Sequence, residues 1–143
     1  MKPIHILLVE DNEGDILLTT EALIEGKFTN KVSVAKDGSA AIDFLEKKGV
    51  YTNAEIPDLI LLDINLPKKN GQEVLQHIKN SDALKHIPVI MLTTSSTEKD
   101  ILDSYKNYAN CYITKPVEVT AFSEAIAKIE DFWFTVVKLP PNK

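Results

Sequence analysis

Three short, compact apolar runs restrict the fold of this chain more than any other feature. They are Ile4–Val9, Leu59–Leu62 and Val89–Leu92. Apolar runs without polar alternation are typical of strands buried on both faces, as in a parallel sheet covered by helices. Two shorter runs, Val32–Ala35 and Cys111–Thr114, predict two weaker strands. The sequence therefore predicts a sheet of five buried strands.

Helical patterns lie between these strands. Apolar residues recur at helical spacing in five segments, at residues 16–24, 40–45, 74–78, 101–105 and 122–137. Gly26 and Gly49 are stop signals for the first two helices, and Ser95–Glu98 is a capping box ahead of the fourth. A strand followed by a helix, five times over, predicts an α/β domain with a parallel sheet and right-handed crossovers.

Composition narrows the class of protein. A chain of 143 residues, of which 44% are hydrophobic and 26% charged, is predicted to form one globular domain over residues 1–143. Its apolar runs are too short to span a bilayer, and a net charge of −5 argues against nonspecific binding to nucleic acid. One cysteine and no secretory signal predict a cytoplasmic protein with no membrane partner.

Functional residues are expected where the carboxyl ends of the parallel strands meet. Glu10 and Asp11 follow the first strand, and Asp63 follows the third. Thr93 ends the fourth strand, and Lys115 follows the fifth. The predicted topology therefore brings three carboxylates, a hydroxyl and an ammonium to one edge of the sheet.

Each of these residues also has a purely structural interpretation. Glu10 and Asp11 could cap the first helix, and Lys115 could be a solvated loop lysine. Thr93 could be an ordinary strand residue. Asp63 is harder to explain in this way, because it interrupts the apolar stretch from residue 59 to residue 66. A carboxylate in such surroundings is costly unless it is paired or bound to a metal.

Taken together, the set has a common chemistry. Converging carboxylates repel one another and therefore require a cation. Oxygen donors without a nearby histidine or cysteine favour a hard ion, Mg²⁺ before Ca²⁺. An ammonium and a hydroxyl across the pocket could bind phosphoryl oxygens, and phosphoryl transfer depends mainly on such positioning. Motifs for a serine or cysteine nucleophile are missing, which leaves a carboxylate as the expected nucleophile.

Four segments of the chain resemble the receiver domain of two-component response regulators. They are Ile6–Asn12, Asp58–Pro67, Pro88–Thr94 and Tyr112–Pro116, and they occur in the family's order. The resemblance extends from residue 4 to about residue 130. It implies a doubly wound, flavodoxin-like, five-stranded parallel sheet with strand order 2-1-3-4-5 and helices on both faces.

The resemblance also implies roles for the acidic residues. Asp63 would be the phosphoacceptor. Glu10 and Asp11 would be the acidic pair for Mg²⁺, with Asp11 and Asp63 as direct ligands and Asn65 supplying its backbone carbonyl. Glu10 stands where the family often has aspartate, and its longer side chain could hold the metal through water.

Three further residues match positions of the family that handle the phosphoryl group and its signal. Thr93 and Lys115 would act with the phosphoacceptor, the lysine by binding phosphoryl oxygens. Thr93 and Tyr112 would be the switch pair that reports phosphorylation. Pro116 is expected to follow a cis peptide bond that directs Lys115 into the pocket.

The resemblance implies a single-domain signalling protein, not an enzyme. It would accept a phosphoryl group on Asp63 from a partner histidine kinase and signal through protein contacts by a conformational switch. One alternative is a small Mg²⁺-dependent aspartyl phosphatase or phosphotransferase, although such enzymes carry an aspartate where this chain has Asn65. Another is a pseudo-receiver, a binding module that is never phosphorylated.

The last helix points to a more specific partner and to self-association. A long second connection and an aromatic-rich last helix resemble the small regulators paired with bacterial, especially cyanobacterial, phytochromes. Beyond the stripe that a receiver needs for its own core, Phe132, Phe134 and Val137 widen the apolar surface. We expect a C-terminal helical extension over about residues 130–143 that forms a homodimer through these three residues. The alternative is that this segment folds back over its own domain.

Overall fold

Five strands form one parallel sheet in the computed structural model, which describes residues 4–26, 29–93 and 111–135. The strands are β1 (Ile4–Val9), β2 (Thr29–Ala35), β3 (Leu59–Asp63), β4 (Val89–Thr93) and β5 (Cys111–Thr114). The helices are α1 (Glu13–Glu25), α2 (Gly38–Leu45), α3 (Gly71–Lys79) and α5 (Val119–Thr135), with a 3₁₀ turn at Gly49–Tyr51. The helix expected around residues 101–105 and its capping box lie outside the described residues.

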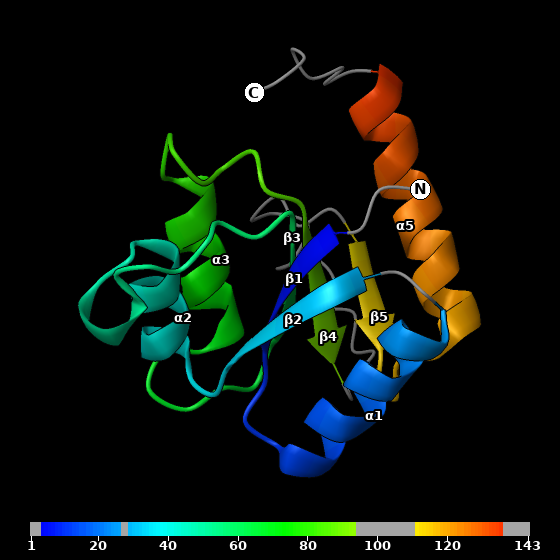
Figure 1. Ribbon diagram of the computed structural model, residues 1–143, viewed down its shortest axis with the longest axis horizontal. Helices are drawn as coiled ribbons and strands as arrows, with labels where there is room; N and C mark the ends of the chain where they lie inside the picture. The colour runs from blue at the N-terminus through cyan, green and yellow to red at the C-terminus, as the bar shows by residue number, and fades with distance from the viewer. Residues whose placement is uncertain (1–3, 27–28, 94–110, 136–143) are drawn as a thin grey trace.

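The order of the strands is β2-β1-β3-β4-β5, which confirms the predicted fold class (Figure 1). Register aligns the carboxyl ends of the central strands: Val9 pairs with Leu62, and Asp63 pairs with Leu92. On the far side of β4, Thr93 pairs with Thr114. Residues that follow these strands therefore gather at one edge of the sheet.

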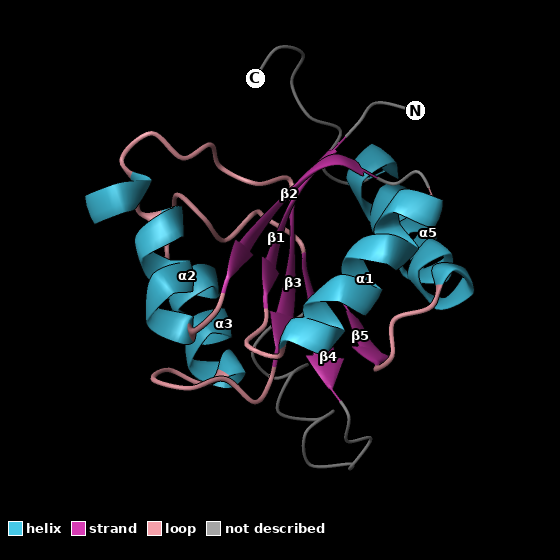
Figure 2. Ribbon diagram, turned by 60° about the horizontal axis from the view of Figure 1, so that its bottom comes forward, coloured by secondary structure: helices cyan, strands magenta, loops and turns pink. Residues whose placement is uncertain are grey.

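Helices cover both faces of the sheet (Figure 2). Alternate strand residues, among them Leu7 and Leu62, pack with α2 and α3 in one buried cluster. Their neighbours, such as Leu8 and Leu61, pack with α1 and α5 in a second cluster. Because both faces are buried, the central strands need apolar side chains at almost every position, which explains the compact apolar runs in the sequence.

Side chains cap the helices that start at the functional edge. Asn12 accepts a hydrogen bond from the backbone N–H of Asp15 at 2.8 Å, and Asp37 accepts one from Ala40 at 2.7 Å. Asn70 and Glu73 form a reciprocal capping box at α3. These caps satisfy N–H groups that the first helical turn leaves without partners, so each helix begins at a fixed point after its strand.

Two predicted boundaries were wrong. The second strand begins at Thr29, three residues before the expected Val32, because its polar start pairs with β1 at the edge of the sheet. The second helix ends at Leu45 rather than running up to Gly49, since Lys47 adopts a positive φ of 59° that a helix does not accept. Within the described part of the chain, no helix is long and apolar enough to cross a membrane.

Candidate functional site

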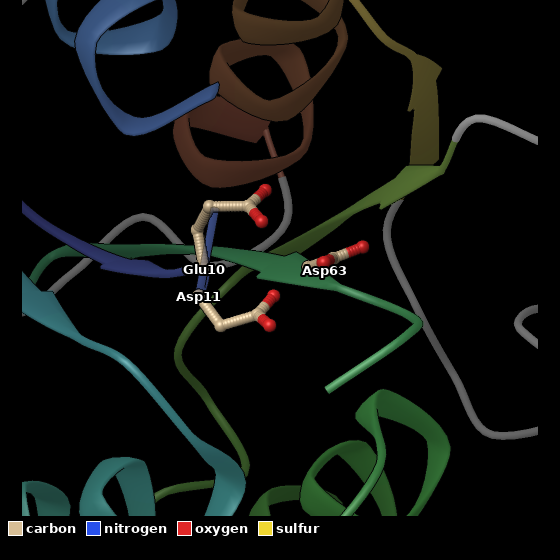
Figure 3. Close-up of side chains that lie close together, drawn as sticks. All are labelled: Glu10, Asp11 and Asp63. Atoms are coloured by element: carbon tan, nitrogen blue, oxygen red, sulfur yellow. The ribbon is translucent and has the colours of Figure 1, made fainter. Parts of the chain in front are cut away.

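Three carboxylates converge at the carboxyl edge of the sheet (Figure 3). Oxygens of Glu10, Asp11 and Asp63 all lie within 4.8 Å of one another. Glu10 and Asp63 are buried, with exposed fractions of 1% and 4%, whereas Asp11 is exposed. The cluster therefore combines two buried oxygen donors with one that is open to solvent. This arrangement suits a hard divalent cation that retains free coordination positions.

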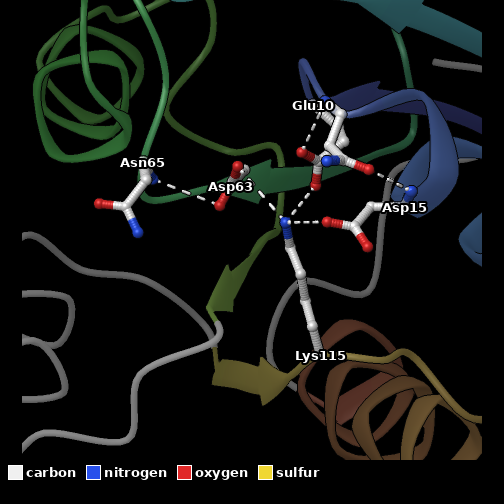
Figure 4. Close-up of polar contacts among 6 residues, drawn as sticks. Glu10, Asp15, Asp63, Asn65 and Lys115 are labelled. Atoms are coloured by element: carbon white, nitrogen blue, oxygen red, sulfur yellow. Dashed lines mark hydrogen bonds and ion pairs between the residues drawn. The ribbon is translucent and has the colours of Figure 1, made fainter.

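Backbone pairing places these carboxylates. Asp63 is the last residue of β3, and Glu10 directly follows β1, the neighbouring strand. The backbone N–H of Asn12 donates to Glu10 Oε2 at 3.1 Å, and that of Asn65 donates to Asp63 Oδ1 at 3.3 Å. The side chain of Asn65 points away from the carboxylates (Figure 4).

Lys115 brings a positive charge to the same pocket (Figure 4). Its Nζ lies 2.5 Å from Glu10 Oε1, 3.0 Å from Asp15 Oδ2 and 3.4 Å from Asp63 Oδ2. The lysine side chain is only 8% exposed. The peptide bond between Lys115 and Pro116 is cis, as expected from the sequence.

Electrostatics at the site leave an excess of negative charge. Burial, together with the neighbouring Glu10 carboxylate, raises the pKa of Asp63 to about 6, although Lys115 opposes the shift. Burial lowers the pKa of Lys115, but its hydrogen bonds to Glu10 and Asp15 outweigh this effect, so its pKa is raised. Among the described residues, one ammonium therefore faces the three-carboxylate cluster and Asp15, and a divalent cation would offset the remaining charge.

The other two residues expected to act in the switch, Thr93 and Tyr112, lie on the neighbouring strands β4 and β5. Thr93 is 1% exposed at the end of β4, and its backbone carbonyl accepts a hydrogen bond from the Lys115 N–H at 2.8 Å. Tyr112 on β5 is half-buried and packs against the core cluster beneath α2 and α3. The structure thus brings Glu10, Asp11, Asp63 and Lys115 into one cluster.

Two residues of the site escaped the sequence analysis. Asp15, in the first turn of α1, forms the hydrogen bond to Lys115 described above. The signal available for it was its place four residues after Asp11 at the start of a helix. Gly71 begins α3, and a Cβ there would lie 2.3 Å from the Asp63 carbonyl oxygen. A glycine is therefore required where the chain turns back after Asp63.

The residues expected at a dimer interface fall outside what the structure describes. The backbone of α5 is described as far as Thr135, which includes Phe132 and Phe134, but their side chains are not. Val137 lies beyond the described residues. The dimer stays a prediction.

Comparisons with known proteins show the family and agree with this fold. The family model for the response regulator receiver domain matches residues 6–127. The response regulator Rcp1 of Synechocystis is 45% identical over 138 residues, which cover 96% of this chain and 94% of that protein. The Mn²⁺-bound form of Rcp1 superposes with a TM-score of 0.74, covering 96% of this chain and 99% of that one.

Two further solved structures are similar over nearly the whole chain. The phosphorylated cyanobacterial phytochrome response regulator RcpA is 46% identical with a TM-score of 0.79, covering 97% of this chain and 99% of that one. The bacteriophytochrome response regulator AtBRR is 43% identical with a TM-score of 0.83, covering all of both chains.

Proposed function

Because this chain belongs to the response regulator receiver family, we propose that it accepts a phosphoryl group on Asp63 from a partner histidine kinase. Receiver domains are signalling proteins rather than classical enzymes. The observation that carries the proposal is the setting of Asp63: a buried carboxylate at a strand end, clustered with Glu10 and Asp11 and 3.4 Å from the Lys115 ammonium.

The proposed reaction is a displacement at phosphorus. A carboxylate oxygen of Asp63 forms the new O–P bond as the N–P bond to the donor histidine breaks, and that histidine keeps the electron pair. The Lys115 ammonium, held at the pocket by Glu10, then pairs with a phosphoryl oxygen. Glu10, Asp11, Asp63 and the Asn65 carbonyl are the residues that would hold Mg²⁺.

The donor set supports a metal at this place. All three clustered side chains are carboxylates, and two of them are buried, with Lys115 as the one ammonium close by among the residues that the structure describes. Mg²⁺ bound there would neutralise the charge that phosphoryl oxygens bring. The relative Rcp1 has a Mn²⁺-bound form, which is consistent with a divalent cation in this family.

Phosphorylation would change the conformation through Thr93 and Tyr112. The added phosphoryl group brings roughly one to two negative charges, by analogy with other phosphorylated side chains. Thr93 ends β4, which neighbours β3, and is buried, so we expect its hydroxyl to move toward the new oxygens. Tyr112, on the next strand, would then turn inward and alter the surface that a signalling partner reads.

The relatives support a phytochrome kinase as the phosphate donor, since RcpA and AtBRR are named as phytochrome and bacteriophytochrome response regulators. In this proposal residues 1–143 act as one cytoplasmic receiver domain. The C-terminal extension over about residues 130–143 forms a homodimer through Phe132, Phe134 and Val137. The signal then leaves through protein contacts rather than through nucleic acid or a membrane.

Labelling with a small phosphodonor tests the central claim. Incubation with acetyl phosphate and Mg²⁺, followed by intact mass measurement, should show one added phosphoryl group. The group should be absent from Asp63→Asn and from a reaction with chelator, and should persist in Asp82→Asn, whose carboxylate is 98% exposed and outside the pocket. Labelling that survives Asp63→Asn would overturn the assignment, and a wild type that takes no label would favour the pseudo-receiver.

A further inference from the structure

The Lys115 ammonium contacts three carboxylates, and these differ in whether they also belong to the candidate metal site. Glu10 and Asp63 belong to the cluster that could hold a metal, and Asp15 does not. Asp15 is nevertheless nearer to the ammonium than Asp63 is, at 3.0 Å against 3.4 Å. The residue proposed to bind a phosphoryl group on Asp63 is therefore also held by a carboxylate outside the acceptor cluster.

Local structure fixes Asp15 in this position. Its backbone N–H donates to the Asn12 side chain at 2.8 Å, and the Asn12 backbone N–H donates to Glu10 Oε2 at 3.1 Å. These hydrogen bonds tie the first turn of α1 to the residue that follows β1. Figure 4 shows Glu10 and Asp15 on the side of the pocket away from Asn65. Glu10 and Asp15 thus hold the Lys115 ammonium from two directions.

We propose that Asp15 is a positioning residue that restrains the Lys115 ammonium from moving onto a phosphoryl group at Asp63. The inference rests on the proposed function of Asp63. An ammonium has three N–H donors, and two short contacts already engage it with Glu10 and Asp15. The third N–H is left for a phosphoryl oxygen, but the ammonium can move closer to Asp63 only by lengthening its contact with Asp15, so Asp15 weakens the hold of the pocket on a bound phosphoryl group.

The size of the effect follows from the exposure of the pair. The Asp15 side chain is 31% exposed, and the Lys115 side chain is 8% exposed. An ion pair with one partner exposed to solvent contributes little free energy. Removing the pair between Asp15 and Lys115 should therefore change the affinity of the pocket for a phosphoryl group by about threefold to fivefold. The expected direction is tighter binding, because the ammonium is released toward Asp63.

Binding of beryllium trifluoride in the presence of Mg²⁺, followed by titration calorimetry, tests the proposal, since this anion mimics a phosphoryl group on a carboxylate. Asp15→Asn should bind it about threefold to fivefold more tightly than wild type. Asp15→Glu should return the affinity toward wild type, because the carboxylate is restored. The matched control is Glu13→Gln in the same helical turn, whose carboxylate is 73% exposed and pairs with Lys36 instead.

A double-mutant cycle separates positioning from simple charge repulsion. In a Lys115→Gln background, Asp15→Asn should have no further effect on binding of the analogue. An equal gain in both backgrounds, or an equal gain from Glu13→Gln, would overturn the positioning role, as would Asp15→Asn binding like wild type. If Asp15→Asn does not fold, judged by thermal melting, Asp15→Ser takes its place. A wild type that binds the analogue but fails these comparisons contradicts only this inference, whereas a wild type that binds none contradicts the proposed function of Asp63.

Discussion

His5 shows how strongly burial can change one side chain far from the site. It lies near the start of β1, at the opposite edge of the sheet from the carboxylates, and is 8% exposed. Its Nε2 lies 2.9 Å from Ser33 Oγ, whereas its buried Nδ1 has no hydrogen-bond partner among the residues that the structure describes. Burial and the charge of Lys31 lower the pKa of His5 below its usual 6.5. The imidazole is therefore expected to be neutral in the folded protein at pH 7.

This predicts a loss of stability in mild acid. A folded-state pKa below that of the unfolded chain means that the unfolded chain binds the proton more readily. The stability due to neutral His5 is present above about pH 6.5 and is lost as the pH falls through the lowered pKa. Urea unfolding at pH 7.5 and at pH 5.5 should show a smaller decrease in the free energy of unfolding for His5→Gln than for wild type.

A control is needed because Asp63 titrates in the same range with the opposite sign. The pKa of Asp63 is raised to about 6, so the folded state binds that proton more readily and gains stability as the pH falls. Both proteins in the comparison keep Asp63, and its contribution cancels in the difference between them. The exposed His86, changed to Gln, is the matched substitution. A pH dependence that is the same in His5→Gln and wild type would contradict the prediction.

At the scale of elements, the turn from β3 into α3 packs directly against the backbone of Asp63 at the site. Gly71 donates its N–H to the Ile64 carbonyl at 2.8 Å, and a Cβ at Gly71 would lie 2.7 Å from Ile64 Cα as well as 2.3 Å from the Asp63 carbonyl oxygen. These neighbours are backbone atoms, so they cannot relieve a clash by a change of rotamer as a flexible side chain could. Helix α3 therefore starts against the strand that carries Asp63.

Gly71→Ala is predicted to disturb both stability and the site. Overpacking of this kind costs roughly 1–3 kcal/mol in the free energy of unfolding, and the displaced backbone belongs to Asp63, so Mg²⁺ affinity should fall as well. Gly14→Ala in α1 is the control, because its nearest neighbour, Asn12 Oδ1 at 3.3 Å, belongs to a side chain. Chemical unfolding and Mg²⁺ titration measure the two effects. If Gly71→Ala kept the wild-type free energy of unfolding and the wild-type Mg²⁺ affinity, the predicted clash would be contradicted.

The same elements show what the sequence could and could not predict. The central strands were predictable because burial on both faces demands an apolar side chain at every position, as in Leu59–Leu62. The start of β2 was not, because the edge strand tolerates the polar residues from Thr29 to Lys31. In the site, Asp63 and Lys115 were predictable because parallel topology alone brings strand ends together. Asp15 was not, since its contact depends on how α1 docks against a residue 100 positions away.

At the scale of the whole molecule, the end of α5 stands out by its aromatic residues. Phe122, Ala125 and Ile126 are buried and pack into the core cluster beneath α1 and α5. The helix continues for nine residues after Ile126, to Thr135, and this part includes Phe132, Trp133 and Phe134. The sequence predicts that one stripe of this helix supplies the receiver core, and we expect Phe132, Phe134 and Val137, which lie beyond that stripe, to need another surface to cover them.

We expect that surface to be a second copy of the chain, since a two-fold axis is the commonest way in which one protein buries its own apolar patch. Sedimentation at tens of micromolar, a concentration set by ordinary affinities between proteins, should give a dimer for wild type and a monomer for Phe132→Glu combined with Phe134→Glu. The matched control places the same charges on another apolar surface, with Leu17→Glu and Leu18→Glu on α1, where the wild-type side chains are 58% and 50% exposed. That control should stay dimeric. A folded wild type that sediments as a monomer would show that the second half of α5 is covered by its own domain or by a different partner.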